Sequence, residues 1–208
     1  MAHPLTVLFV TDPLCSWCWG MADAIETVRG KLADQVDFDL VLGGINTDST
    51  QPVGSYGRRL MRRLWQEVAA TTQQPLAELP VEAYVHNSVP VCLVLERLRI
   101  VKGAPPFEAL NELQRRFFTQ GENTTAAEFL LAFLRQEGID LPSLEVWSKD
   151  PALQERLRFQ FNMARSFGTE AMTSVLLRRG SDTRLIAGGY LDSSMLESLI
   201  VEATKRVL

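Results

Sequence analysis

The chain has 208 residues, of which 46% are hydrophobic and 22% are charged, and its formal net charge is -4 at pH 7. This composition is typical of a globular protein with a substantial core, and it gives no electrostatic reason to expect nucleic acid or a membrane surface as a partner. No apolar run approaches the roughly 20 residues that span a bilayer. Residues 1–5 contain no basic signal-peptide region, so we expect no signal peptide and a cytoplasmic location.

The first part of the chain predicts a strand, a helix and a second strand. The β-branched and aromatic run at 5–11 predicts a buried strand, and apolar residues at helical spacing predict a helix from Cys15 to about Leu32. Residues 36–42 predict a central strand, which ends at two glycines. A strand–helix–strand unit implies a parallel pair of strands.

The middle and the end of the chain differ in character. Apolar residues at helical spacing, interrupted by prolines, predict four to six helices and no strand between residues 56 and 167. Residues 174–178 and 184–187 predict an antiparallel hairpin, and Asp192 or Ser193 is expected to cap a last helix that runs to about Arg206. The order predicts an α/β, thioredoxin-like fold (β-α-β, then β-β-α) in which residues 1–54 and 168–208 form one discontinuous domain. Residues 55–167 are then an all-helical insertion.

Two cysteines follow the first predicted strand directly. A Cys-x-x-Cys pair at a strand-to-helix junction is the layout of a thioredoxin-type redox site, because the unpaired N–H groups at a helix N-terminus stabilise a thiolate. We therefore expect Cys15 to be the exposed nucleophile, with a lowered pKa, and Cys18 to be the more buried thiol that resolves the mixed disulfide. The segment reads Asp12-Pro13-Leu14-Cys15-Ser16-Trp17-Cys18-Trp19-Gly20.

The neighbours of the two cysteines supply further candidates. Trp17 and Trp19 flank the pair, where they either form an apolar platform for a substrate or pack against the insertion. Asp12 is a candidate proton acceptor for Cys18 if it is buried; the alternative is that the Asp-Pro pair only shapes the loop. Ser16 is a candidate hydrogen-bond donor to the sulfur of the nucleophile.

Zinc binding is the competing interpretation of the Cys-x-x-Cys pair. A closed zinc site needs two further ligands at short spacing, and only Cys92, His3 and His86 remain, so we expect no metal. Cys92 lies in an apolar helical run and is expected in the core, whereas His86 is expected at the surface or capping a helix. A basic cluster at helical spacing is expected to be solvated or to attract an acidic partner or glutathione: Arg58, Arg59, Arg62 and Arg63.

The chain resembles the DsbA family of thiol–disulfide oxidoreductases, and within it the FrnE-like branch. The resemblance covers nearly the whole chain and is carried by the Cys-x-x-Cys segment, by Asn-Ser-Val-Pro-Val-Cys at 87–92, and by Phe117-Phe118 with Glu122-Asn123. It implies dithiol–disulfide exchange at the two cysteines with a disulfide-bearing protein or peptide. Glutathione is a candidate co-substrate, and no other cofactor is implied.

The chain departs from that family at one loop. Thioredoxin-fold enzymes usually place a cis-proline before the third strand, in a loop that faces the cysteines and pairs with the substrate. The alignment from Gly168 onward puts Thr173 at that position, after Met172, and all ten prolines lie at or before Pro151. The resemblance implies substrate binding by Met172 and Thr173 across a bond that is either strained or trans, because a cis bond before a non-proline residue costs about 2.5–4 kcal/mol.

Two other classes share this scaffold. Glutathione-dependent isomerases such as 2-hydroxychromene-2-carboxylate isomerase usually carry a serine in place of the cysteine pair, so the two cysteines argue against that class. An adaptor that delivers a transcription factor to ClpXP is similar in fold, and the helical insertion would give it a protein-binding surface. An adaptor would keep its partner after both cysteines are replaced, whereas an exchange enzyme would capture it only as a mixed disulfide.

Overall fold

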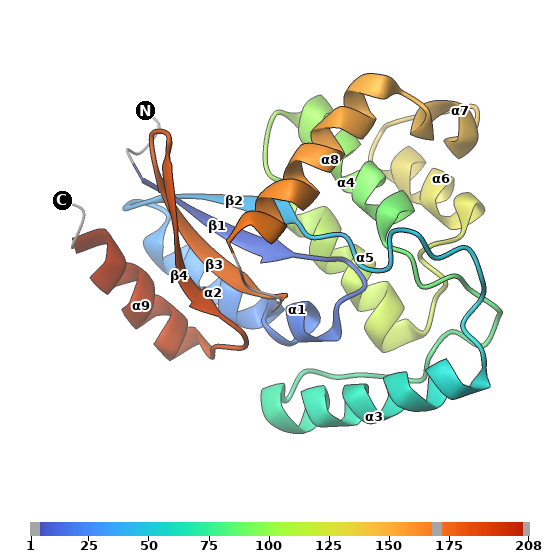
Figure 1. Cartoon of the computed structure of the whole chain (residues 1–208), viewed down its shortest axis with the longest axis horizontal. Coiled ribbons are helices and arrows are strands. Elements are labelled where there is room, and N and C mark those ends of the chain that lie inside the picture. Colours follow the sequence, from blue (N-terminus) through green and yellow to red (C-terminus); the bar gives the residue numbers. More distant parts are fainter. Residues whose placement is uncertain (1–4, 168–171, 206–208) are drawn as a thin grey trace.

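The sheet of this computed structural model unites the two ends of the chain. Residues 5–167 and 172–205 are described, and their strands form one mixed sheet in the order β2-β1-β3-β4 (Figure 1). β1 pairs parallel with β2 and antiparallel with β3, and β3 pairs antiparallel with β4. The predicted β-α-β and β-β-α parts therefore build one sheet; its strands are β1 (Leu5–Thr11), β2 (Asp37–Leu42), β3 (Ser174–Arg179) and β4 (Asp182–Gly188).

Helices surround the sheet and fill the predicted insertion. Between β2 and β3 the described residues form six helices and no strand, as predicted. No helix in the described parts of the chain is both long and apolar enough to cross a membrane. The helices are α1 (Ser16–Gly20), α2 (Ala22–Leu32), α3 (Ser55–Thr72), α4 (Val89–Lys102), α5 (Phe107–Gln120), α6 (Ala127–Gln136), α7 (Leu144–Ser148), α8 (Pro151–Ser166) and α9 (Ser193–Lys205).

Successive side chains of β1 point alternately into two different apolar layers. Val7 and Phe9 point into the larger core, which includes residues of α2 and α9, whereas Leu8 and Val10 pack with Ala164 of α8. This alternation follows from the period of two along a strand. In Figure 1, α2 and α9 accordingly lie on one side of the sheet and the end of α8 lies on the other.

The helix predicted over residues 15–32 is two helices. The break falls at Met21, which is fully buried and whose N–H donates to the carbonyl groups of both Trp17 and Cys18 at 3.2 Å. Gly20 lets the end of α1 approach α3, since a Cβ at this position would lie 2.7 Å from the side chain of Thr72. Apolar residues continue at helical spacing through both helices, so periodicity alone concealed the break.

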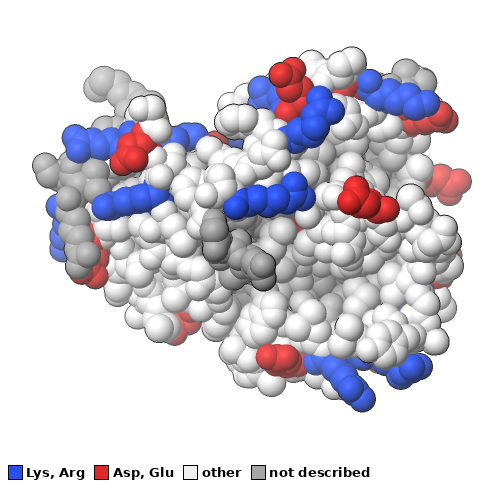
Figure 2. Space-filling model, in the orientation of Figure 1, with Lys and Arg blue, Asp and Glu red and all other residues white. Residues whose placement is uncertain are grey.

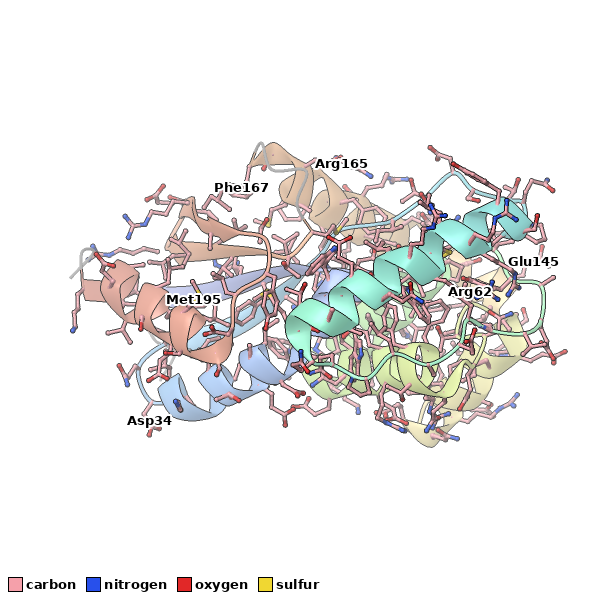
Figure 3. All side chains as sticks on the ribbon, turned by 90° about the horizontal axis from the view of Figure 1, so that it is seen from below. Asp34, Arg62, Glu145, Arg165, Phe167 and Met195 are labelled. Carbon is pink, nitrogen blue, oxygen red and sulfur yellow. The ribbon has the colours of Figure 1, made fainter. Side chains whose placement is uncertain are left out.

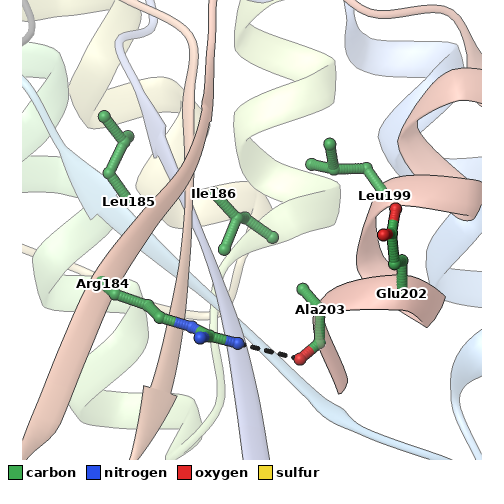
Figure 4. A pocket seen from close by; sticks show the side chains of 6 residues that line it. All are labelled: Arg184, Leu185, Ile186, Leu199, Glu202 and Ala203. Atoms are coloured by element: carbon green, nitrogen blue, oxygen red, sulfur yellow. Dashed lines mark hydrogen bonds between the residues drawn. The ribbon is translucent and has the colours of Figure 1, made fainter. Parts of the chain in front are cut away.

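The C-terminal helix starts as predicted. The carboxylate of Asp192 accepts the N–H of Met195 at 2.8 Å, which caps α9; the predicted end at Arg206 lies outside the described residues. A cavity of about 220 Å³ lies between β4 and α9, where the guanidinium of Arg184 donates to the carbonyl of Ala203 at 2.9 Å (Figure 4). Neither cysteine nor histidine is among its described lining residues, so this cavity is distinct from the cysteine site.

Candidate active site

The two cysteines lie where β1 leads into α1. Both are free thiols, and the sulfur of Cys15 accepts the N–H of Cys18 at 3.3 Å. The N–H of Cys15 donates to the carbonyl of Asp12 at 3.2 Å, which closes the turn between strand and helix. Cys15 is 7% exposed and Cys18 is 2% exposed. The local fold therefore holds the two thiols together, with Cys15 the more accessible of the two.

The prediction that Cys15 is an exposed thiol of lowered pKa is wrong for this dithiol state. A hydrogen bond with the thiol of Cys18 and burial raise the pKa of Cys15 well above its usual range, and the charge of Asp12 raises it further. The N–H of Cys18 acts in the opposite direction, as a helix N-terminus should, but α1 has only five residues and its effect is the smaller one. Cys15 is therefore held as a neutral thiol.

A cavity of about 520 Å³ lies beside Cys15, between the turn and α3. We call it the thiol cleft. Among its described lining residues there is no aspartate, glutamate, lysine or arginine, so it is an uncharged site with mainly apolar walls. Its described lining residues include Cys15, Trp17, Ile45, Met61, Leu64, Trp65 and His86.

The two tryptophans have different environments. Trp19 is 7% exposed, donates its indole N–H to the carbonyl of Pro75 at 3.0 Å, and stacks on Phe118 with ring centroids 6.2 Å apart. Trp17 is half-buried, lines the thiol cleft and lies 6.3 Å from the ring of Tyr190. Only Trp17 is therefore placed to meet a substrate, and Trp19 packs against the insertion.

Asp12 meets the burial that a proton acceptor requires. It is 0% exposed, and one carboxylate oxygen accepts the N–H of Leu14 at 2.8 Å. The other accepts the hydroxyl of Ser88 at 2.6 Å and the N–H of Ile45 at 2.9 Å. Burial raises the pKa of Asp12, and these hydrogen bonds partly oppose the rise. The bond to Leu14 also shapes the turn, so Asp12 has the loop role as well.

Ser16 does not donate the hydrogen bond that was predicted for its hydroxyl. Ser16 is buried, at 4% exposed, but among the described contacts the sulfur of Cys15 receives its hydrogen bond from the N–H of Cys18 and not from the Ser16 hydroxyl. The backbone of α1 therefore supplies the donor that the side chain was expected to provide.

The loop before β3 replaces the family's proline with a different geometry. No cis peptide bond occurs in the described residues, so the Met172–Thr173 bond is trans, and Thr173 has a left-handed backbone with φ 49°. The carbonyl of Thr173 accepts the N–H of Gly189 at 2.8 Å, and the thioether of Met172 lies against Gly43. Neither residue is among the described residues that line the thiol cleft, so their substrate role stays a prediction. Residues 168–171 of that alignment lie outside the described residues.

The prediction that His86 lies at the surface or caps a helix is wrong. His86 is half-buried, lines the thiol cleft, and its ring lies 6.0 Å from that of Tyr84 and 6.1 Å from that of Phe117. Its Nδ1 is buried without a hydrogen-bond partner among the described residues. Burial lowers the pKa of His86 to about 4, so the imidazole is neutral at pH 7.

We expect His86 to make the protein sensitive to acid. An unfolded histidine binds a proton below a pH of about 6.5, whereas the folded one does so only near pH 4, so stability falls as pH falls through this window. The free energy of unfolding of the wild type should drop by up to about 1.4 kcal/mol per pH unit relative to His86→Phe. Urea unfolding at several pH values measures both proteins, and any contribution of Asp12 is common to them. Parallel pH profiles would contradict the expectation.

Cys92 is a core residue, as predicted. It is 0% exposed in α4, and burial raises the pKa of its thiol well above the usual range. Within residues 5–167 and 172–205, no group of three or more histidine, cysteine, aspartate or glutamate side chains is arranged to hold a metal ion. His3 lies outside the described residues.

The basic cluster of α3 is partly structural. Arg58 donates to the carbonyl groups of Pro80 and Glu82 at 2.6 and 2.7 Å, and Arg62 pairs with Glu78 at 3.4 Å, so both hold the segment after α3. The other two arginines of the cluster are exposed, as a solvated face requires. Basic side chains project at the lower edge of Figure 2, where α3 lies in Figure 1, and Figure 3 shows α3 with Arg62 across the near side. None of the four is among the described residues that line the thiol cleft.

The class of fold is a thioredoxin-like sheet interrupted by a helical insertion, the architecture found in DsbA-like proteins. No family model matches the sequence, and no curated protein matches it. A candidate protein disulfide isomerase from Nitrosomonas europaea is similar over 97% of this chain and 98% of its own, with 22% identity and a TM-score of 0.84.

Two further structures share the whole architecture. The cytosolic disulfide reductase DsbM from Pseudomonas aeruginosa is 20% identical over 98% of this chain and 100% of its own, with a TM-score of 0.78, and it has also been solved with glutathione. A 2-hydroxychromene-2-carboxylate isomerase is 15% identical over 97% of this chain and 95% of its own, with a TM-score of 0.61. These likenesses establish the fold alone.

Proposed function

We propose that this protein is a thiol–disulfide oxidoreductase of the DsbA family, of the FrnE-like branch, acting through Cys15 and Cys18. The observation that carries the proposal is a pair of free thiols in hydrogen-bond contact, with Cys15 in the wall of the thiol cleft. Fold likeness to proteins described as a disulfide reductase and a candidate disulfide isomerase supports it.

The exchange proceeds in two displacements. Cys15 loses its proton as it attacks a substrate disulfide, so that a bond between Cys15 and one substrate sulfur forms while the substrate S–S bond breaks, and the other sulfur leaves as a thiolate that takes up the proton. Cys18 then gives its proton to Asp12 and attacks the sulfur of Cys15. The Cys15–Cys18 disulfide forms, the mixed disulfide breaks, and the second substrate sulfur leaves and is protonated. The substrate gains two electrons and the enzyme loses two.

The electrostatics of Cys15 favour the reducing direction. Strong oxidants of this kind owe their high potential to a stabilised reduced form. Here the Cys15 thiolate is disfavoured by burial and by the neighbouring carboxylate of Asp12. We therefore propose a reductase, in keeping with the cytoplasmic location proposed from the sequence.

The walls of the thiol cleft favour one class of substrate over another. Glutathione carries carboxylates that would lose hydration in an uncharged cleft without gaining an ionic partner, whereas an apolar peptide segment would bury its side chains there. We propose a protein or peptide disulfide as the substrate. Glutathione remains the candidate co-substrate that returns electrons to the enzyme.

Equilibration in glutathione buffers, followed by trapping of free thiols, tests the proposal. We expect a reversible Cys15–Cys18 disulfide with a potential near that of thioredoxin, about -270 mV. Cys92→Ser, which removes only the core thiol, should have the same potential, and Cys15→Ser should form no such disulfide. A potential of about -120 mV would overturn the proposal that the protein acts as a reductase. A pair that never forms a reversible disulfide would overturn the proposed function in favour of an adaptor.

A further inference from the structure

Ser88 occupies the position of a helix cap without acting as one. It directly precedes α4, but its side chain makes no hydrogen bond to the first turn of that helix. Ser88 is 0% exposed, and its hydroxyl instead donates to the carboxylate of Asp12 at 2.6 Å. Serine at a helix start normally satisfies the free N–H groups there. The Ser88 hydroxyl therefore donates to the carboxylate of Asp12 instead of capping α4.

The surroundings of Ser88 offer its hydroxyl a second acceptor. The N–H of Ile45 donates to the Ser88 oxygen at 2.7 Å, and the carbonyl of Ile45 lies 3.3 Å from the same oxygen. A serine hydroxyl has one proton to donate and two lone pairs to accept with, and it rotates to suit its partners. The proton of Ser88 can thus point to Asp12 or to the carbonyl of Ile45, and the thiol of Cys92 also lies within hydrogen-bond reach of the same hydroxyl.

These two orientations match the two protonation states of Asp12. When Asp12 is ionised, Ser88 donates to it. When Asp12 holds a proton, it donates that proton toward the Ser88 oxygen, which still accepts the N–H of Ile45 while its own hydrogen turns to the Ile45 carbonyl. No buried polar group is left without a partner in either state, which avoids the cost of an unmade buried hydrogen bond.

We infer that Ser88 is the positioning residue that lets the buried Asp12 take up and release a proton during exchange. The inference rests on the proposed function, in which Asp12 receives the proton of Cys18 and passes it to the departing substrate thiolate. The charge of Asp12 acts on the thiols of Cys15 and Cys92, and the thiol of Cys15 is in hydrogen-bond contact with that of Cys18. No salt bridge in the described residues involves Asp12. The ionised carboxylate of Asp12 is therefore stabilised by hydrogen-bond donors.

The titration of the Asp12 carboxyl carbon, followed by NMR in the reduced protein, tests the inference. Ser88→Ala removes a donor to the ionised form, and hydrogen bonds to charged groups are the stronger ones, so the pKa of Asp12 should rise by about one pH unit. The pH at which resolution of the mixed disulfide reaches half its maximal rate should rise with it. Ser88→Thr keeps the hydroxyl and should keep the wild-type value.

A matched control removes a buried hydroxyl elsewhere in the insertion. Thr124 is 1% exposed and its hydroxyl has no hydrogen-bond partner in the part of the chain that is described, so Thr124→Val should leave the Asp12 titration unchanged. An Asp12 titration that stays at the wild-type pH in Ser88→Ala, whatever happens to the melting temperature, overturns the inference. The titration needs no turnover, so absence of exchange in the wild type would refute the proposed function separately.

Discussion

Replacing Asp12 with asparagine is expected to slow resolution of the mixed disulfide by about 10²- to 10⁴-fold, the usual contribution of a positioned proton acceptor. Asparagine is close to the shape of a protonated aspartate, and Ser88 can accept from its amide as it would from the protonated acid. The fold should therefore survive the change. The charge of Asp12 raises the pKa of Cys15, so its removal should leave the first attack as fast or make it faster.

In Asp12→Asn the attack of Cys15 on the substrate should be as fast as in the wild type or faster, while the attack of Cys18 should be slower. The mixed disulfide should therefore accumulate. Acid quenching at short times, followed by mass spectrometry of the trapped protein, measures both rates. Cys18→Ser marks the limit, because it captures substrate on Cys15 and cannot release it. If Asp12→Asn resolves the mixed disulfide at the wild-type rate, Asp12 has only its loop-shaping role.

Replacing Arg99 with methionine is expected to destabilise the protein by about 3–5 kcal/mol, the range found when one partner of a buried ion pair is removed. Glu96 of α4 is 0% exposed and depends on neighbours for its charge. The guanidinium of Arg99 donates to it at 3.1 Å, that of Arg156 does so at 2.7 Å, and the amide of Gln160 also donates to it. Arg99 further contacts the carboxylate of Asp39 and is only 14% exposed, so its loss takes an ionic partner from two carboxylates at once.

The same helix provides the control. Lys102 of α4 pairs with Glu137, but its side chain is 49% exposed, and exposed pairs contribute about 0–1 kcal/mol. Urea unfolding should therefore separate Arg99→Met from Lys102→Met by several-fold in the free energy lost. Equal small losses would show that Glu96 is stabilised without Arg99.

The fold was predictable because its signals are local. Short β-branched, aromatic and apolar runs marked the strands, and helical spacing broken by prolines marked the insertion. The cysteine pair was recognisable because Cys15 and Cys18 are near neighbours in the chain and follow β1 directly. Each of these features depends on residues within a few positions of one another.

The electrostatics of the site were not predictable in the same way. Asp12 and Ser88 are 76 positions apart, and no pattern in the chain joins them. His86 enters the thiol cleft only because the segment after α3 folds back against Phe117. The acidity expected for Cys15 was wrong for the same reason, since burial and its neighbours, rather than its place in the motif, set its pKa.

The turn that carries Cys15 and Cys18 makes contacts with both parts of the chain. Trp19 anchors its indole N–H on Pro75 and its ring on Phe118, and Asp12 takes its shortest hydrogen bond from Ser88. Excising residues 55–167 would thus remove the partners of the turn as well as a separate lobe. A chimera that exchanges the helical insertion would therefore have to carry the cysteine turn along with its new neighbours.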